Sequence, residues 1–86
     1  MISGTEGVTV ILSIAQMQAL QGGRVVACHG GHGFSRRLDA MGIRPGVTIE
    51  KIVAQPFRGP SVIRVCGTQV AIGFGMAQRI LVEVDE

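Results

Sequence analysis

The sequence is 86 residues long, which is enough for one small domain, and 47% of its residues are apolar while 16% are charged. This balance excludes a disordered chain, and the 13 glycines follow no period, which excludes a collagen-like repeat. The net charge of +2 comes from basic residues that are spread along the chain, so they form no nucleic-acid footprint.

The N-terminal segment predicts a lead-in followed by a short helix. Residues 1–11 are expected to form a flexible lead-in, although the β-branched run 8–12 also fits a short strand. The run from Ser13 to Gln16 fits a capping box, in which each side chain satisfies a backbone amide of the other. Good helix formers continue the pattern, so we predict a helix over 13–20 that ends at a double glycine.

The next segment predicts a strand and a loop that carry possible metal ligands. Residues 24–28 are rich in β-branched side chains and predict a strand, and residues 29–33 predict a flexible glycine-rich loop. A thiolate and two imidazoles from Cys28, His29 and His32 are candidate ligands for a divalent transition metal such as Fe²⁺ or Zn²⁺. Their spacing matches no standard zinc pattern, and a loop with two exposed histidines is the alternative. A second molecule is a possible source of further ligands.

The clearest helix is predicted over 34–41. Phe34, Leu38 and Met41 recur at helical spacing and define one apolar face. Gly42 follows at the position where a helix commonly ends with a left-handed residue.

A turn and a long strand are predicted next. Pro45-Gly46 has the order that a type II turn requires, and it opens a strand over 47–54. Lys51 occupies an inward position in this strand, so we expect a β-bulge near Glu50–Lys51 to restore the alternation. A turn region with two prolines follows at 55–60.

The C-terminal part predicts strands at 61–66, 69–74 and 79–84. Residues 75–78 leave room for a single helical turn. Cys66 ends a strand and is expected to be a small buried apolar group, and neither cysteine belongs to a disulfide framework. Five short strands with turns between them favour a mainly β fold, a small barrel with one or two short α-helices.

The run Arg37-Leu38-Asp39-Ala40-Met41-Gly42-Ile43-Arg44-Pro45-Gly46 has the pattern R-L-x-x-M-G-I-x-P-G and opens into a strand. It resembles the signature of the ferrous iron transport protein A (FeoA) family. Flanking features agree in order, namely Leu12-Ser13, Gly23-Arg24-Val25, Gly59-Pro60, Val70-Ala71-Ile72 and Ala77 to Val82. The chain has Gly73-Phe74 where family members often carry a leucine and an arginine. The resemblance implies an SH3-like five-stranded barrel domain over 12–84.

Most of the signature has a structural interpretation. Leu38 and Met41 are expected to anchor the helix on the barrel, Gly42 to turn the chain, and Pro45-Gly46 to begin the next strand. The exposed cations Arg36, Arg37 and Arg44, together with the loop 29–33, are the candidate partner-binding residues.

The resemblance implies a cytoplasmic accessory or regulatory protein of bacterial ferrous iron uptake. Its implied partner is the membrane ferrous iron transporter, on the cytosolic part that binds GTP. Nothing in the sequence resembles a catalytic triad, a carboxylate pair or a phosphate-binding loop, so we expect no enzyme activity. No stretch resembles a signal peptide or a membrane span, so we expect reduced thiols and no membrane insertion.

Two alternatives remain open. The same barrel resembles the C-terminal domain of iron-dependent repressors, so a stand-alone metal-binding or repressor-type SH3-like regulatory module is the main alternative. A nucleic-acid-binding barrel is disfavoured, because three phenylalanines and one lysine offer little for base stacking or phosphate contacts. A weak homo-oligomer is compatible with the sequence.

Overall fold

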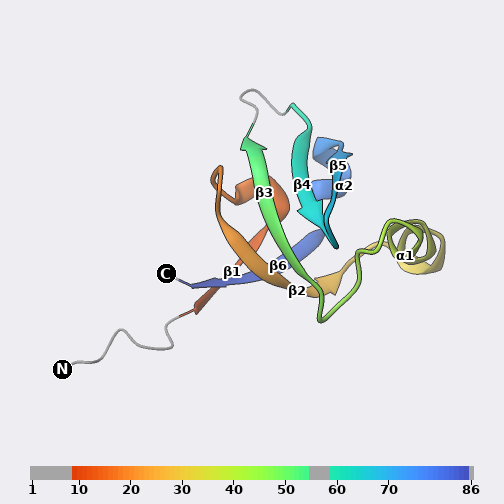
Figure 1. Cartoon of the computed structure of the whole chain (residues 1–86). Coiled ribbons are helices and arrows are strands. Elements are labelled where there is room, and N and C mark those ends of the chain that lie inside the picture. The colour runs from red at the N-terminus through yellow and green to blue at the C-terminus, as the bar shows by residue number, and fades with distance from the viewer. Residues whose placement is uncertain (1–8, 55–58, 86) are drawn as a thin grey trace.

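The computed structural model describes residues 9–54 and 59–85. The elements in chain order are β1 (Thr9–Ser13), the 3₁₀ helix η1 (Ile14–Gln16), β2 (Gly22–Cys28), α1 (Gly31–Ala40), β3 (Thr48–Ala54), β4 (Ser61–Val65), β5 (Thr68–Ile72), α2 (Phe74–Ala77) and β6 (Ile80–Asp85) (Figure 1). Six strands form one antiparallel sheet in the order β1-β6-β2-β3-β4-β5.

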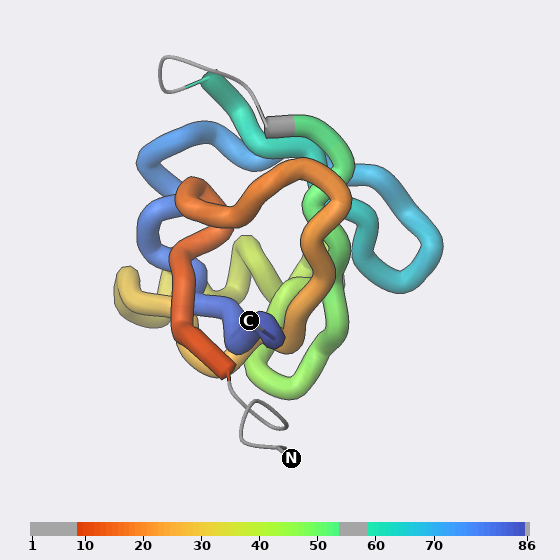
Figure 2. The backbone as a smooth tube through the Cα atoms, turned by 90° about the vertical axis from the view of Figure 1, so that its left-hand side faces the viewer, coloured from red at the N-terminus to blue at the C-terminus, as the bar shows by residue number. Residues whose placement is uncertain are grey.

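The sheet curls around its core instead of lying flat (Figure 2). Register shifts support this curvature, one between Val25 and Ala27 in β2 and one between Lys51 and Val53 in β3. Within the described residues the edge strands β1 and β5 are not paired with each other, so the barrel is open. The mainly β, SH3-like fold is confirmed, but the expected number of five strands is wrong because β1 adds a sixth.

The core is aliphatic and is supplied by alternate positions of the strands. In β6, the predicted inward residues Ile80, Val82 and Val84 are all buried. Their neighbours in the core are Ile14, Met17, Val25, Leu38, Ile43, Ile49, Ile63, Val65, Ile72 and Ala77. Burial of one such large aliphatic side chain contributes about 1.5–3 kcal/mol.

The start of the chain differs from its prediction. Thr9–Ser13 forms a strand, so part of the segment expected to be a lead-in is ordered, whereas residues 1–8 lie outside the described part. The helix predicted over 13–20 is wrong. Only the three residues of η1 are helical, although the Ser13 amide does donate to Gln16 Oε1 at 2.9 Å. Met17 leaves the helix in an extended conformation, and its side chain is buried in the core.

Helix α1 is longer than predicted. It starts at Gly31, so the expected flexible loop over 29–33 is wrong for residues 31–33, which form the first turn. Glycine costs only about 1 kcal/mol relative to alanine inside a helix, so tertiary packing overrides its propensity. Here the Phe34 ring packs over Gly30, where a Cβ atom would lie 2.5 Å from the ring.

The end of α1 explains the first half of the signature. Gly42 has φ +84°, its amide donates to the Asp39 carbonyl at 2.9 Å, and the Ile43 amide donates to the Leu38 carbonyl at 2.9 Å. These two bonds form a Schellman motif, which satisfies carbonyls that the helix end would leave unpaired. Leu38 is fully buried, and Met41 packs against the core.

The second half of the signature is a turn that leads into β3. Gly46 has φ +97°, and the Val47 amide donates to the Arg44 carbonyl at 3.1 Å, as the predicted type II turn requires. The predicted bulge is present, but it lies at Ile52, one residue beyond its predicted place, and Lys51 remains in its inward position. Residues 55–58 of the predicted turn region lie outside the described part.

The C-terminal elements contain two corrections. Cys66 is exposed and not buried, because it occupies a tight turn between β4 and β5 with φ +52°. The strand predicted over 69–74 ends at Ile72, and Phe74 begins the single helical turn of α2.

Candidate functional site

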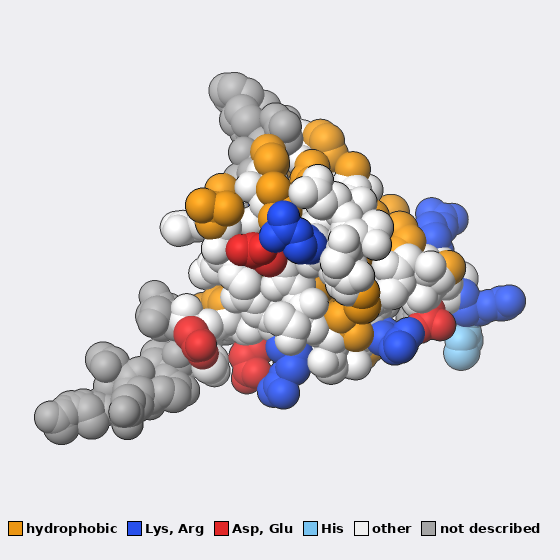
Figure 3. Space-filling view, viewed as in Figure 1, with side chains coloured by type: hydrophobic (Ala, Val, Ile, Leu, Met, Phe, Trp, Pro, Cys, Tyr) orange, Lys and Arg blue, Asp and Glu red, His pale blue; other side chains and the backbone are white. Residues whose placement is uncertain are grey.

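The three arginines predicted to bind a partner lie near one end of the molecule. Arg36 and Arg37 are on α1, Arg44 is in the turn that follows it, and all three side chains are exposed. Figure 3 shows basic side chains gathered at this end, with an acidic and a histidine side chain between them. Arg44 Nη1 donates to Asp39 Oδ1 at 2.9 Å, and both groups are largely exposed. Such a pair contributes little stability, so these side chains remain available to a partner.

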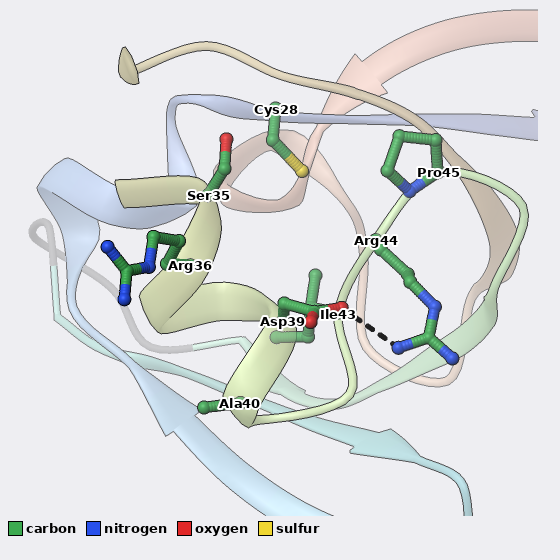
Figure 4. A pocket seen from close by; sticks show the side chains of 8 residues that line it. All are labelled: Cys28, Ser35, Arg36, Asp39, Ala40, Ile43, Arg44 and Pro45. Carbon is green, nitrogen blue, oxygen red and sulfur yellow. Dashed lines mark hydrogen bonds and ion pairs between the residues drawn. The ribbon is translucent and has the colours of Figure 1, made fainter. Parts of the chain in front are cut away.

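A surface hollow of about 490 Å³ lies beside these arginines (Figure 4). Its lining residues come from the end of β2, from α1 and from the turn after α1, and they are Cys28, Ser35, Arg36, Asp39, Ala40, Ile43, Arg44 and Pro45. The structure therefore brings Arg36, Arg44 and Cys28 together at one site. Arg37, His29 and His32 do not line it.

The Cys28 thiol faces this hollow (Figure 4). Burial raises the pKa of the Cys28 thiol above its ordinary value, because the thiolate would lose solvation. Burial therefore favours the neutral thiol of Cys28 over the thiolate, which is the nucleophilic form. Both Cys28 and Cys66 are free.

The predicted metal ligands Cys28, His29 and His32 lie at the end of β2, in the link that follows it and on the first turn of α1. His29 is exposed, and its amide donates to the Arg79 carbonyl at 2.8 Å. His32 is exposed on the first turn of α1. Between residues 9–54 and 59–85, no group of three or more His, Cys, Asp or Glu side chains is placed to hold a metal ion. A metal bound by Cys28, His29 and His32 stays a prediction, and it would require further ligands.

The sequence did not single out Arg79 as a member of the basic end. Its guanidinium carbon lies 5.8 Å from the centroid of the Phe34 ring, so Arg79, the residue before β6, packs against α1. This cation–π contact is worth about 0.5–1 kcal/mol at an exposed site. Only the three-dimensional fold brings Phe34 and Arg79 together, because 44 intervening residues separate them along the chain.

None of the helices in the described residues is long and apolar enough to cross a membrane.

Comparison with known proteins places the fold in a family. A family model described as the FeoA domain matches residues 12–84. A crystal structure of an iron uptake regulatory protein (FeoA) superposes with a TM-score of 0.81 at 36% identity, covering 87% of this chain and 100% of that one. The NMR structure of a FeoA-like protein from Clostridium acetobutylicum has a TM-score of 0.75 at 23% identity and covers 86% of each chain. No curated protein matches the sequence.

The fold also occurs within larger regulators. A manganese-dependent transcriptional repressor superposes with a TM-score of 0.79 at 18% identity. The match covers 92% of this chain but 44% of the repressor. At this identity, the likeness shows the fold alone.

Proposed function

The chain belongs to the FeoA family, and we propose that it acts as a non-catalytic accessory protein that docks on the membrane ferrous iron transporter. The FeoA domain over 12–84 implies involvement in ferrous iron transport. The proposed docking surface on the transporter is its cytosolic GTP-binding part. The proposed effect is regulation of uptake.

The observation that carries the docking proposal is the basic end of the molecule. Arg36, Arg37 and Arg44 project from one helix and the rigid turn that ends it, and α1 is anchored by the buried side chain of Leu38. Cations held on a fixed element steer association and set the orientation of a complex at little cost in ordering. An interface centred on one short helix would also be small, which suits reversible regulation.

Charge reversal tests this surface. The double variant Arg37→Glu/Arg44→Glu should weaken binding to the soluble GTP-binding part of the transporter by at least about tenfold, because it reverses the charge through which the proposed docking operates. Binding is measured by calorimetry, and urea unfolding should show stability within about 1 kcal/mol of the parent, because the lost Arg44–Asp39 ion pair is exposed.

The matched control is Arg64→Glu, which also removes one exposed ion pair, with Glu50 at 2.8 Å, but on the outer face of β3 and β4. This control should bind like the parent protein. Unchanged affinity of the double variant would place the docking surface elsewhere.

A repressor-type or metal-binding regulatory module is the second candidate, and the likeness to the manganese-dependent repressor favours it only at the level of the fold. Metal binding is the discriminating property. Binding of Fe²⁺, under anaerobic conditions, and of Zn²⁺ is measured by calorimetric titration. Submicromolar binding by the parent protein that is lost in the double variant His29→Ala/His32→Ala would support this candidate.

A further inference from the structure

The hollow beside α1 combines apolar and basic lining residues, and the docking proposal does not yet say what it binds. Part of its lining is apolar: Ala40 and Pro45 are exposed, Cys28 is half-buried, and Ile43 is a buried core residue that reaches the lining. Covering such a surface with an apolar side chain removes it from water and is favourable.

Two guanidinium groups border the same hollow from different elements. Arg36 comes from α1 and Arg44 from the turn, and they lie on opposite sides of the hollow in Figure 4. Arg44 uses Nη1 to bind Asp39, which restrains its side chain and leaves other N–H donors open to a ligand. In the part of the chain that the structure describes, Arg36 forms no ion pair.

The charge balance at the hollow is positive. Asp39 is the one carboxylate in the lining, and Arg44 compensates it. The C-terminal end of α1 adds a partial charge of about −0.5, which is smaller than the full charge of Arg36. Arg37 on the same helix and Arg79 against Phe34 extend the positive region beyond the hollow.

We infer that the hollow receives a short segment of the partner in which an acidic side chain stands beside an apolar one. The apolar side chain would cover the exposed Ala40 and Pro45 beside the buried Ile43, and the carboxylate would reach Arg36 or the open donors of Arg44. A volume of about 490 Å³ suits such an occupant, because pockets for small ligands span about 300–1,000 Å³. A nucleic acid fits less well, since its phosphates would engage the arginines but leave the apolar lining uncovered.

This inference rests on the proposed function for the identity of the partner, but the chemistry of the hollow can be tested without it. The ¹⁵N-labelled protein is titrated with the peptide acetyl-Gly-Leu-Glu-Asp-Leu-Gly-amide and with its uncharged counterpart acetyl-Gly-Leu-Gln-Asn-Leu-Gly-amide. We expect the acidic peptide to shift the amides of residue 28 and residues 35–45, and to bind at least about fivefold more tightly than the uncharged one. Equal binding of the two peptides, or shifts spread over the sheet, would overturn the inference.

Substitutions then distinguish binding at the hollow from nonspecific attraction of the peptide to positive charge. Arg36→Gln and Arg44→Gln should each lower the affinity for the acidic peptide by about tenfold, because each removes a charged hydrogen-bond donor. Arg64→Gln, which disrupts a comparable ion pair on the outer face of β3 and β4, should leave the affinity unchanged. An equal loss in Arg64→Gln would contradict the inference, as would tighter binding of polyuridylate than of the peptide at the same amides.

The outcomes for the hollow and for the proposed function are distinct. Loss of peptide binding in Arg36→Gln, with transporter docking intact, would show that the transporter does not occupy the hollow, and it would overturn the inference for this partner. Failure of the acidic peptide to bind the parent protein, while docking still depends on Arg37 and Arg44, would overturn the inference and leave the proposed function standing.

Discussion

At the scale of single residues, Gly23 occupies the tightest position among the glycines of the sheet. A Cβ atom there would lie 2.5 Å from Val82 Cγ1, 2.6 Å from the Glu83 carbonyl oxygen and 2.7 Å from Val84 Cγ1. The two methyl groups belong to core side chains and the oxygen belongs to the backbone of β6, so none of them can yield cheaply. This close approach of β2 to β6 gives a physical reason for glycine in the Gly23-Arg24-Val25 segment.

We therefore predict that Gly23→Ala lowers the free energy of unfolding by about 1–3 kcal/mol, as overpacked core sites do. Urea unfolding measures the change. Gly33→Ala is the control, because its added Cβ meets nothing within 4 Å and the position is helical. The control should gain about 0.5–1 kcal/mol from helix propensity. Equal effects of the two substitutions would contradict the close approach.

Lys51 is a charged residue that is buried in the core. Its side chain is 2% exposed, and Nζ donates to the carbonyl oxygens of Ile14 at 2.7 Å and Ala15 at 3.4 Å. These bonds tie β3 to η1. Burial lowers the pKa of Lys51 below its ordinary value of 10.5, since the ammonium group loses solvation.

The lowered pKa predicts a pH-dependent stability difference between the parent and Lys51→Met. Between the lowered pKa and 10.5, the unfolded state binds more protons than the folded state, so the contribution of Lys51 to stability rises with pH. Urea unfolding at several pH values up to 10.5 should show the parent gaining stability relative to Lys51→Met. The raised pKa of Cys28 acts in the opposite direction, but it is common to both proteins and cancels. If the difference in free energy of unfolding between the two proteins stayed constant with pH, the lowered pKa of a buried Lys51 would be contradicted.

Sequence patterns predicted the residues whose role is local. The helix-ending conformation of Gly42 and the turn at Pro45-Gly46 follow from short-range backbone preferences, which the sequence displays directly. The burial of Lys51 and the exposure of Cys66 do not follow from such short-range preferences. Lys51 is buried because its ammonium group reaches carbonyl oxygens of η1, and Cys66 is exposed because strand pairing fixes the geometry of its turn.

At the scale of elements, the turn between β4 and β5 is strained. Cys66 and Gly67 both have positive φ, at +52° and +77°, and Val65 pairs directly with Thr68. This is the geometry of a two-residue type I′ hairpin, for which Asn-Gly is the preferred sequence. The left-handed conformation costs a residue such as cysteine about 1–2 kcal/mol.

Cys66→Asn should therefore stabilise the protein by about 0.5–1 kcal/mol, because asparagine tolerates the left-handed region. The comparison variant Cys66→Ala removes the thiol without supplying that tolerance, and it should gain nothing. Thermal unfolding of both variants under reducing conditions measures the difference. A gain of the same size in the alanine variant would assign the effect to the thiol instead of the backbone.

The positions of α1 and η1 show where element prediction succeeds and fails. The apolar face of α1 is strongly periodic, so the existence of the helix and its end at Gly42 were predictable. Its start was not, because Phe34 packing over Gly30 overrides the poor helix propensity of residues 31–33. The longer helix predicted after Ser13 has the right start signal, but burial of Met17 ends it after three residues.

At the scale of the whole molecule, the sheet topology assembles the candidate site. The end of β2, helix α1 and the turn after it line the hollow, and the turn before β6 places Arg79 against Phe34. The sequence identified all three exposed arginines of the signature region. It could not predict that Arg36 and Arg44 border the hollow while Arg37 does not, because this depends on the chain reversal after α1.

The α1 end of the protein is the proposed docking surface for the transporter. It is tested by an amide-proton NMR titration of the ¹⁵N-labelled protein with the soluble GTP-binding part of the matching ferrous iron transporter. We expect shifts confined to residues 28–45 and the neighbourhood of Arg79, and we expect the double variant Arg37→Glu/Arg44→Glu to lose them. Shifts centred instead on the outer face of β3 and β4, around Val53 and Val62, would contradict it.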